Sequence, residues 1–179
     1  MSPPTEAAGL VVIGGLPGTG KTSIATLVAR RVHATYLRID TIEQALADSG
    51  ELPRPPVTAG YRTGYAVARD QLRLGHIVVA ECVNPLRLSR DAWYAVATES
   101  GCWAVEVELV CSDSAEHRRR VETRVSDIPG LVLPSWPQVL ERVYEPWHRD
   151  HLVIDTAVSS IAEAAGRIVR ETEDPALRK

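Results

Sequence analysis

A segment of eight residues combines glycine, lysine and threonine in a spacing suited to holding phosphate groups. Residues 15–22 are GLPGTGKT and match the pattern GxxxxGK(S/T). Glycines let backbone N–H groups point inward around an anion, and a following helix adds the positive end of its dipole. The pattern predicts that Lys21, the only internal lysine, reaches the β- and γ-phosphates of a nucleotide and that Thr22 ligates Mg²⁺. The predicted nucleotide-binding residues of this P-loop are Gly15, Gly18, Thr19, Gly20, Lys21, Thr22 and Ser23.

A second candidate is the carboxylate of Asp40, which follows the apolar segment 34–39. We expect this segment to be a strand, and ligands of a parallel sheet bind beyond the carboxyl ends of its strands. A carboxylate there can take the proton of a substrate hydroxyl as the oxygen attacks a γ-phosphate. Asp40 is therefore a candidate catalytic base and substrate-binding residue. The alternative role is a helix N-cap, and one side chain can fill both.

An acidic residue also ends the third apolar segment, at Glu81. At this position, P-loop proteins often carry a carboxylate that holds Mg²⁺ through water, so Glu81 is a candidate metal and substrate residue beside Thr22. The alternative is a purely structural carboxylate. Arg87 and Arg90 follow, and they are candidates for binding an anionic part of the substrate or else surface arginines.

The segment 117–124, HRRRVETR, is strongly basic. At helical spacing His117, Arg120 and Arg124 share one face. Arginines just before a loop with proline and glycine suit a lid that closes on phosphates and neutralises developing charge. We predict that Arg120 and Arg124 are catalytic and that Arg120 also binds the nucleotide. The alternative is a solvated basic helix, and a nucleic-acid patch is disfavoured because no aromatics are interleaved.

Several further residues are candidates for a substrate pocket. Tyr61 and Tyr65 are four residues apart on a predicted helix and share a face. Asp155 ends the last predicted strand, where it could accept hydrogen bonds from a guanine base or cap the final helix. For the aromatic residues between 136 and 147, packing in the core is the favoured alternative to a pocket wall. The candidate pocket residues are Tyr36, Arg38, Tyr61, Tyr65 and Trp136.

The elements that must position these residues alternate between strand and helix. Short apolar runs predict strands at 10–14, 34–39, 76–80, 102–110 and 152–154. Helices are expected at 21–32, 41–47, 57–74, 85–100, 114–125, 138–144 and 159–171, and loops at 49–56 and 127–137. This order predicts an α/β fold with a parallel sheet covered by helices on both faces. No linker divides the chain, so we expect a single domain over residues 1–179.

Composition narrows the class of protein. The chain has 179 residues, 45% of them apolar, and a net charge of −3. The negative charge disfavours duplex binding. The three cysteines lack the spacing of a zinc site or a disulfide framework, which favours a reducing cytoplasm. No secretion signal and no apolar run of membrane-spanning length is present, so no membrane partner is expected.

The P-loop, the RID triplet at 38–40, the HRRRVETR segment and SWPQVLERVYEPW at 135–147 together resemble the small P-loop kinases of the nucleoside-monophosphate-kinase-like class. This class includes gluconate and shikimate kinases, polynucleotide 5′-kinases and chloramphenicol phosphotransferase, and the chain is similar to its group with capuramycin phosphotransferase. The resemblance covers nearly the whole chain. It implies strand order 2-3-1-4-5, Asp40 as base, and a lid at about 114–136 bearing Arg120 and Arg124. Glu81 departs from the aspartate common in this class.

Three functions compete on these observations. The first is transfer of the γ-phosphoryl group of ATP or GTP, with Mg²⁺, to a hydroxyl of a small molecule, which the resemblance extends to an antibiotic such as a capuramycin-type nucleoside. The second is a polynucleotide or metabolite kinase, although the acidic chain lacks the basic groove that a polynucleotide needs. The third is a non-catalytic nucleotide-binding module, which would need neither Asp40 nor the lid. The oligomeric state, monomer or homodimer, stays open.

Overall fold

Strands and helices alternate along the chain in the computed structural model, which describes residues 8–51 and 58–174. The strands are β1 (Gly9–Gly14), β2 (Thr35–Arg38), β3 (Ile77–Glu81), β4 (Trp103–Val110) and β5 (Leu152–Asp155). The helices are α1 (Lys21–Arg31), α2 (Ile39–Asp48), α3 (Ala59–Arg73), α4 (Arg87–Glu99), α5 (Ser114–Thr123), α6 (Trp136–Leu140) and α7 (Ile161–Glu173). None of these helices combines the length and apolar character that crossing a bilayer requires.

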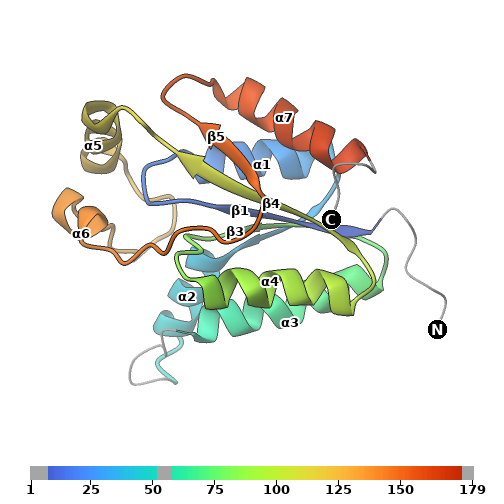
Figure 1. Cartoon of the computed structure of the whole chain (residues 1–179). Helices are drawn as coiled ribbons and strands as arrows, with labels where there is room; N and C mark the ends of the chain where they lie inside the picture. Colours follow the sequence, from blue (N-terminus) through green and yellow to red (C-terminus); the bar gives the residue numbers. More distant parts are fainter. Residues whose placement is uncertain (1–7, 52–57, 175–179) are drawn as a thin grey trace.

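The strands form one parallel sheet in the order β2-β3-β1-β4-β5, which confirms the predicted fold class and order. Helices α1 and α7 cover one face, and α2, α3 and α4 lie on the other (Figure 1). The central strand β1 is buried along its whole length because both of its faces are covered. Its residues alternate between two hydrophobic cores, one on each side of the sheet.

The carboxyl ends of the strands gather the loops that carry the candidate chemistry. The P-loop joins β1 to α1, and α2 begins directly where β2 ends. Helices α5 and α6 lie beyond this end of the sheet rather than on either face (Figure 1). The fold therefore places the P-loop, the start of α2 and the lid, which we define as residues 114–136, around the carboxyl ends of the strands.

Several expected boundaries differ from the structure by one or more residues, and three of these differences affect the site. Helix α2 begins at Ile39 rather than Thr41, because the strand ends at Arg38. Helix α5 ends at Thr123, so Arg124 is extended backbone. The helix expected at 138–144 is instead the short α6, which begins at Trp136 because Ser135 and Gln138 form a capping box and Pro137 is tolerated in a first turn. Part of the loop expected at 49–56, and the first residue of the helix expected at 57–74, fall outside the described residues.

Candidate active site

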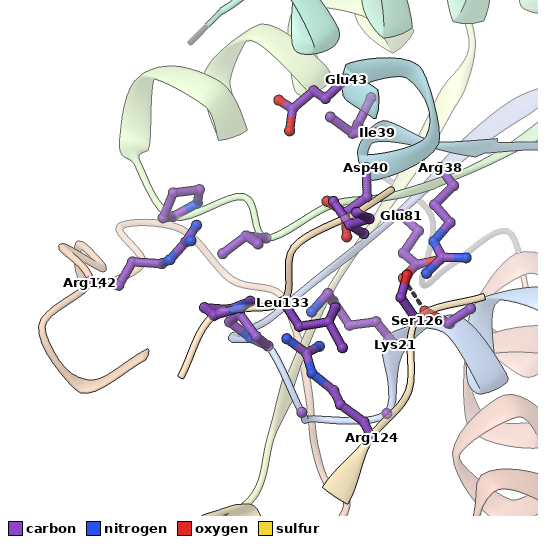
Figure 2. A pocket seen from close by; sticks show the side chains of 18 of the residues that line it. Lys21, Arg38, Ile39, Asp40, Glu43, Glu81, Arg124, Ser126, Leu133 and Arg142 are labelled. Carbon is purple, nitrogen blue, oxygen red and sulfur yellow. Dashed lines mark hydrogen bonds and ion pairs between the residues drawn. The ribbon is translucent and has the colours of Figure 1, made fainter. Parts of the chain in front are cut away.

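One open cavity of about 1220 Å³ lies at the carboxyl ends of the strands. Its walls come from the P-loop, the start of α2, helix α3, the end of β3, the start of α4, helix α5 and the loop between α5 and α6, residues 124–135, which we call the lid loop. Figure 2 shows Lys21, Asp40, Glu81 and Arg124 around this space. The candidate residues brought together in the cavity are Gly18, Gly20, Lys21, Thr22, Ser23, Arg38, Asp40, Tyr61, Tyr65, Glu81, Arg120 and Arg124.

The P-loop glycines are required by backbone geometry. Gly15, Gly18 and Gly20 all have positive φ, and Gly20 is the N-cap of α1. A Cβ on Gly15 would come within 2.4 Å of the Leu109 carbonyl oxygen. Thr19 lies outside the cavity wall, buried, where its hydroxyl donates to the Leu16 carbonyl oxygen at 2.8 Å. Thr19 thus holds the loop's shape from within.

Lys21 is buried at the base of the cavity. Its Nζ donates to the Leu16 carbonyl oxygen at 2.9 Å, so the ammonium folds back over its own loop. Burial lowers the pKa of Lys21, while the charges of Glu81 and Asp40 oppose that shift. The ammonium makes no ion pair with either carboxylate in the described part of the chain, and an incoming phosphate would supply a partner.

Thr22 and Glu81 form the candidate metal position. The Thr22 hydroxyl donates to Glu81 Oε1 at 2.6 Å, and the Tyr36 hydroxyl donates to Glu81 Oε2. Glu81 is 3% exposed, and Arg38 Nε lies 3.9 Å from its Oε2. A threonine hydroxyl beside a buried carboxylate is an oxygen-rich set of the kind that Mg²⁺ prefers, with waters and phosphates completing its shell. These residues fit the ion, and the contact of Glu81 with the metal shell stays a prediction.

Asp40 lies in the first turn of α2, not at a strand end and not at the N-cap, which is Arg38. The expected cap role is therefore wrong, because the helix starts one residue earlier than Asp40. Asp40 makes no hydrogen bond or ion pair with residues 8–51 and 58–174, yet it faces the cavity.

Glu43 is a cavity residue that sequence reasoning missed. It lies three residues after Asp40, on the same face of α2, and this spacing was the available signal. Burial raises the pKa of Glu43 to about 7, the Asp40 charge adds to the rise, and Arg142 opposes it. The backbone of α3 approaches closely at Gly60, where a Cβ would lie 2.2 Å from Glu43 Cγ.

The two lid arginines line the cavity but have different partners. The Arg120 guanidinium is held by hydrogen bonds, which it donates to Glu116 Oε1 at 2.8 Å and to the Thr156 hydroxyl at 3.0 Å. Arg124 Nε is buried without a hydrogen-bond partner among the described residues. Burial lowers the pKa of Arg124, and Asp40 opposes the shift. Arg124 is therefore the lid cation with unused capacity for an anion.

Helix α5 packs directly on the P-loop. His117, a buried residue, places Nε2 2.8 Å from the Pro17 carbonyl oxygen, and its ring meets Trp136 edge-on at 5.1 Å. A Cβ on Gly18 would lie 2.6 Å from Val121 Cγ2. The predicted helical face therefore includes His117 and Arg120 but not Arg124, which follows the end of α5, and His117 anchors the lid rather than meeting solvent.

Other predicted contacts lie elsewhere. Arg90 is fully buried and donates to the carbonyl oxygens of Asn84, Pro85 and Pro146. Its guanidinium lies 4.3 Å from the Trp147 ring and 5.0 Å from the Tyr144 ring, so those aromatics pack around Arg90. Arg90 is not part of the cavity wall, so the structure does not bring it together with the other predicted substrate residues. Arg87 is exposed, pairs with Asp91 at 3.5 Å and also lies outside the cavity wall.

Asp155 links two loops. Its Oδ1 accepts hydrogen bonds from the backbone N–H groups of Ser112 and Ala157, at 3.0 and 2.9 Å. It does not cap α7, because Ser160 forms the capping box there. Asp155 is not part of the cavity wall, and its Oδ1 is occupied by these turns.

A family model described as "AAA domain" (AAA_33) matches residues 10–143. The matched range runs from β1 through the lid, and it includes every cavity residue described above. The chain belongs to this AAA-domain family.

Relatives of this AAA domain by sequence and by fold are P-loop kinases. It is 28% identical over 173 residues to a probable adenylyl-sulfate kinase of Aeropyrum pernix, with 86% of each chain covered. An APS kinase structure from Mycobacterium tuberculosis, in complex with AMPPNP and APS, has a TM-score of 0.69 at 21% identity and covers 95% of this chain and 100% of that one. A gluconokinase from Sinorhizobium meliloti has a TM-score of 0.63 at 22% identity, covering 94% and 96%. The solved structures establish the shared kinase fold.

Proposed function

We propose that this AAA domain transfers the γ-phosphoryl group of a nucleoside triphosphate to a hydroxyl of a small molecule. The observation that carries the proposal is the Asp40 carboxylate, which has no hydrogen-bond or ion-pair partner within residues 8–51 and 58–174 and lines the same cavity as Lys21 and Thr22 of the P-loop. A binding module has no use for a carboxylate held free at that point. A phosphotransferase needs one there to orient or deprotonate the acceptor.

In the proposed reaction the acceptor oxygen forms a bond to the γ-phosphorus as the bond from that phosphorus to the β,γ-bridging oxygen breaks. The acceptor's proton passes to Asp40, and the nucleoside diphosphate leaves with the bridging oxygen. Lys21 and Arg124 neutralise charge on the transferred group, and both have unused donors for it. Mg²⁺ held beside Thr22 and Glu81 would supply further charge neutralisation.

The finer assignments belong to the same proposal. We take ATP or GTP as donor and a hydroxylated antibiotic, such as a capuramycin-type nucleoside, as the acceptor class to test first. Support for that acceptor class comes from the sequence resemblance alone. We expect a cytoplasmic monomer or homodimer that does not act on nucleic acid.

An acceptor screen with matched variants tests the proposal. Wild-type protein with Mg²⁺ and ATP or GTP would be incubated separately with nucleoside antibiotics, sugars and a 5′-hydroxyl oligonucleotide. Mass spectrometry would then detect the added phosphoryl group on the acceptor. Asp40→Asn should keep nucleotide affinity within a few-fold and lower turnover by about 10²–10⁴-fold. Asp48→Asn, an exposed change on the same helix, is the control. Full activity in Asp40→Asn would exclude Asp40 as the base, and a phosphorylated oligonucleotide would identify an end kinase.

A further inference from the structure

The acceptor end of the cavity has a wall of apolar surface on the α3 and α4 side. The hydroxyl of Tyr61 accepts from the Asn84 backbone N–H at 2.9 Å, and the hydroxyl of Tyr65 donates to the Ser89 carbonyl oxygen at 3.3 Å. Both tyrosine hydroxyls therefore already form hydrogen bonds with the backbone of the wall, and burial raises the pKa of each hydroxyl. What remains for a ligand is the aromatic ring surface and the side chain of Leu88, which lines the same cavity and is 77% exposed.

The lid loop contributes a second apolar stretch to the same cavity. Val125 and Val132 line it and are 91% and 88% exposed, so their apolar side chains are open to a ligand. Figure 2 shows Leu133 of this loop beside the space that Lys21 and Arg124 face. The lid-loop residues that line the cavity are Val125, Ser126, Asp127, Leu131, Val132, Leu133 and Pro134.

The arginines expected to hold an anionic acceptor are absent from this wall or already paired. Arg90 is buried among backbone carbonyls, and Arg87 lies outside the cavity. Arg38 is bound to Asp127 through both carboxylate oxygens. Arg62 and Arg142 also line the cavity, together with the carboxyls of Asp40 and Glu43, so both signs of charge are present there.

We propose that the acceptor is an amphipathic alcohol, whose hydroxyl meets Asp40 and whose apolar body lies between the Tyr61–Tyr65–Leu88 wall and the Val125 and Val132 side chains of the lid loop. This inference rests on the proposed function and narrows its substrate class. The apolar side chains and the Asp40 carboxylate line one cavity, so a ligand that uses both needs an apolar body as well as a hydroxyl. The cavity of about 1220 Å³ exceeds the roughly 300–1,000 Å³ of ordinary ligand pockets, which leaves room for a sizeable body beside a nucleotide.

The test uses octyl β-D-glucoside, below its micelle concentration, and methyl β-D-glucoside, which share their hydroxyl groups and differ in the apolar body. Each is titrated into full-length protein with ¹³C-labelled Leu and Val methyls, Mg²⁺ and a non-hydrolysable ATP analogue. We expect the octyl compound alone to shift the methyl signals of Leu88, Val125 and Val132. The double variant Val125→Thr/Val132→Thr should weaken its binding about sixteenfold, because each of the two lost methyls contributes roughly fourfold.

Val158→Thr is the matched control, because Val158 is 80% exposed but lies outside the cavity wall. The proposal is overturned if both glucosides bind equally, if neither binds, or if the shifts fall away from these methyls. It is also overturned if sedimentation shows that Val125 and Val132 are covered by a second copy of the chain. Octyl-specific binding without any phosphoryl transfer in the acceptor screen would instead overturn the proposed chemistry and leave the apolar subsite standing.

Discussion

Arg38 donates from Nη1 to both carboxylate oxygens of Asp127, at 2.9 and 2.7 Å, and so ties the end of β2 to the lid. The two residues are 89 positions apart in the chain. Arg38 also lies 3.9 Å from Glu81, next to the candidate metal position. The lid is therefore connected through one guanidinium to the part of the site where phosphates would lie.

Removing this pair should loosen the lid with little effect on global stability. Asp127 is 68% exposed, and exposed ion pairs stabilise a fold by under about 1 kcal/mol. In Asp127→Asn we expect faster amide hydrogen exchange over 124–134 and an almost unchanged Tm. Glu122→Gln, which breaks the exposed pair with Arg118 on α5, is the control and should leave exchange in that loop unaltered. Equal exchange in both variants would show that the pair does not hold the lid.

The sheet was predictable because its strands are short apolar runs and the P-loop fixes where β1 ends and α1 begins. Local spacing also indicated that Tyr61 and Tyr65 share a face, and both line the cavity. The start of α2 was missed by two residues, because Ile39 suits either a strand or a helix and only the end of pairing at Arg38 decides. Local patterns could thus place the elements but not their boundaries.

The contacts that assign roles to the arginines join distant parts of the chain and leave no local signal. Arg90 seemed available for an anion, yet the rings of Tyr144 and Trp147, more than fifty residues later, enclose it. Arg38 is held by Asp127 in the same way. A charged residue's spacing shows which face it occupies, but its partner depends on tertiary packing.

Glu81→Gln should separate metal-dependent from metal-independent binding. The amide keeps an acceptor for the Thr22 hydroxyl but removes the buried charge that fits Mg²⁺. We expect nucleotide affinity in EDTA to stay within a few-fold, while Mg²⁺-dependent turnover or Mg²⁺ affinity falls about 10–100-fold. Calorimetric titration with and without Mg²⁺ measures this. Glu108→Gln, which alters a β4 carboxylate paired with His151, is the control, and an equal loss with and without metal would contradict the assignment.

Stability should fall as the pH rises through neutrality, because of Glu43. Its pKa in the folded protein is about 7, against an ordinary 4.5. The folded state therefore binds this proton more tightly than the unfolded state, so the contribution is fully present below 4.5 and is lost as the pH passes 7. The loss is on the order of 1 kcal/mol once the partial exposure of the side chain is allowed for.

Urea denaturation between pH 5.5 and 8.5 measures this dependence. Glu43→Gln cannot ionise, so its stability should change less across the range and should exceed that of the wild type at pH 8. Glu173→Gln, at an exposed site at the end of α7, should follow the wild-type curve. A wild-type curve that rises between pH 6 and 8, or a Glu43→Gln curve parallel to it, would contradict the raised pKa.

Gly18 tests whether lid packing shapes the P-loop. Both Gly18 and Gly50 have positive φ, so alanine at either position carries a backbone cost of roughly 1–2 kcal/mol. Only at Gly18 would the new Cβ also press on α5, 2.6 Å from Val121 Cγ2 and 3.2 Å from His117 Cδ2, whereas nothing lies within 4 Å at Gly50. We therefore expect Gly18→Ala to be the more destabilised variant in urea and to bind nucleotide more weakly. Because the backbone cost is common to both variants, the difference in their stability measures the contact between α5 and the P-loop. Equal losses of stability and affinity would show that α5 moves aside without a measurable cost.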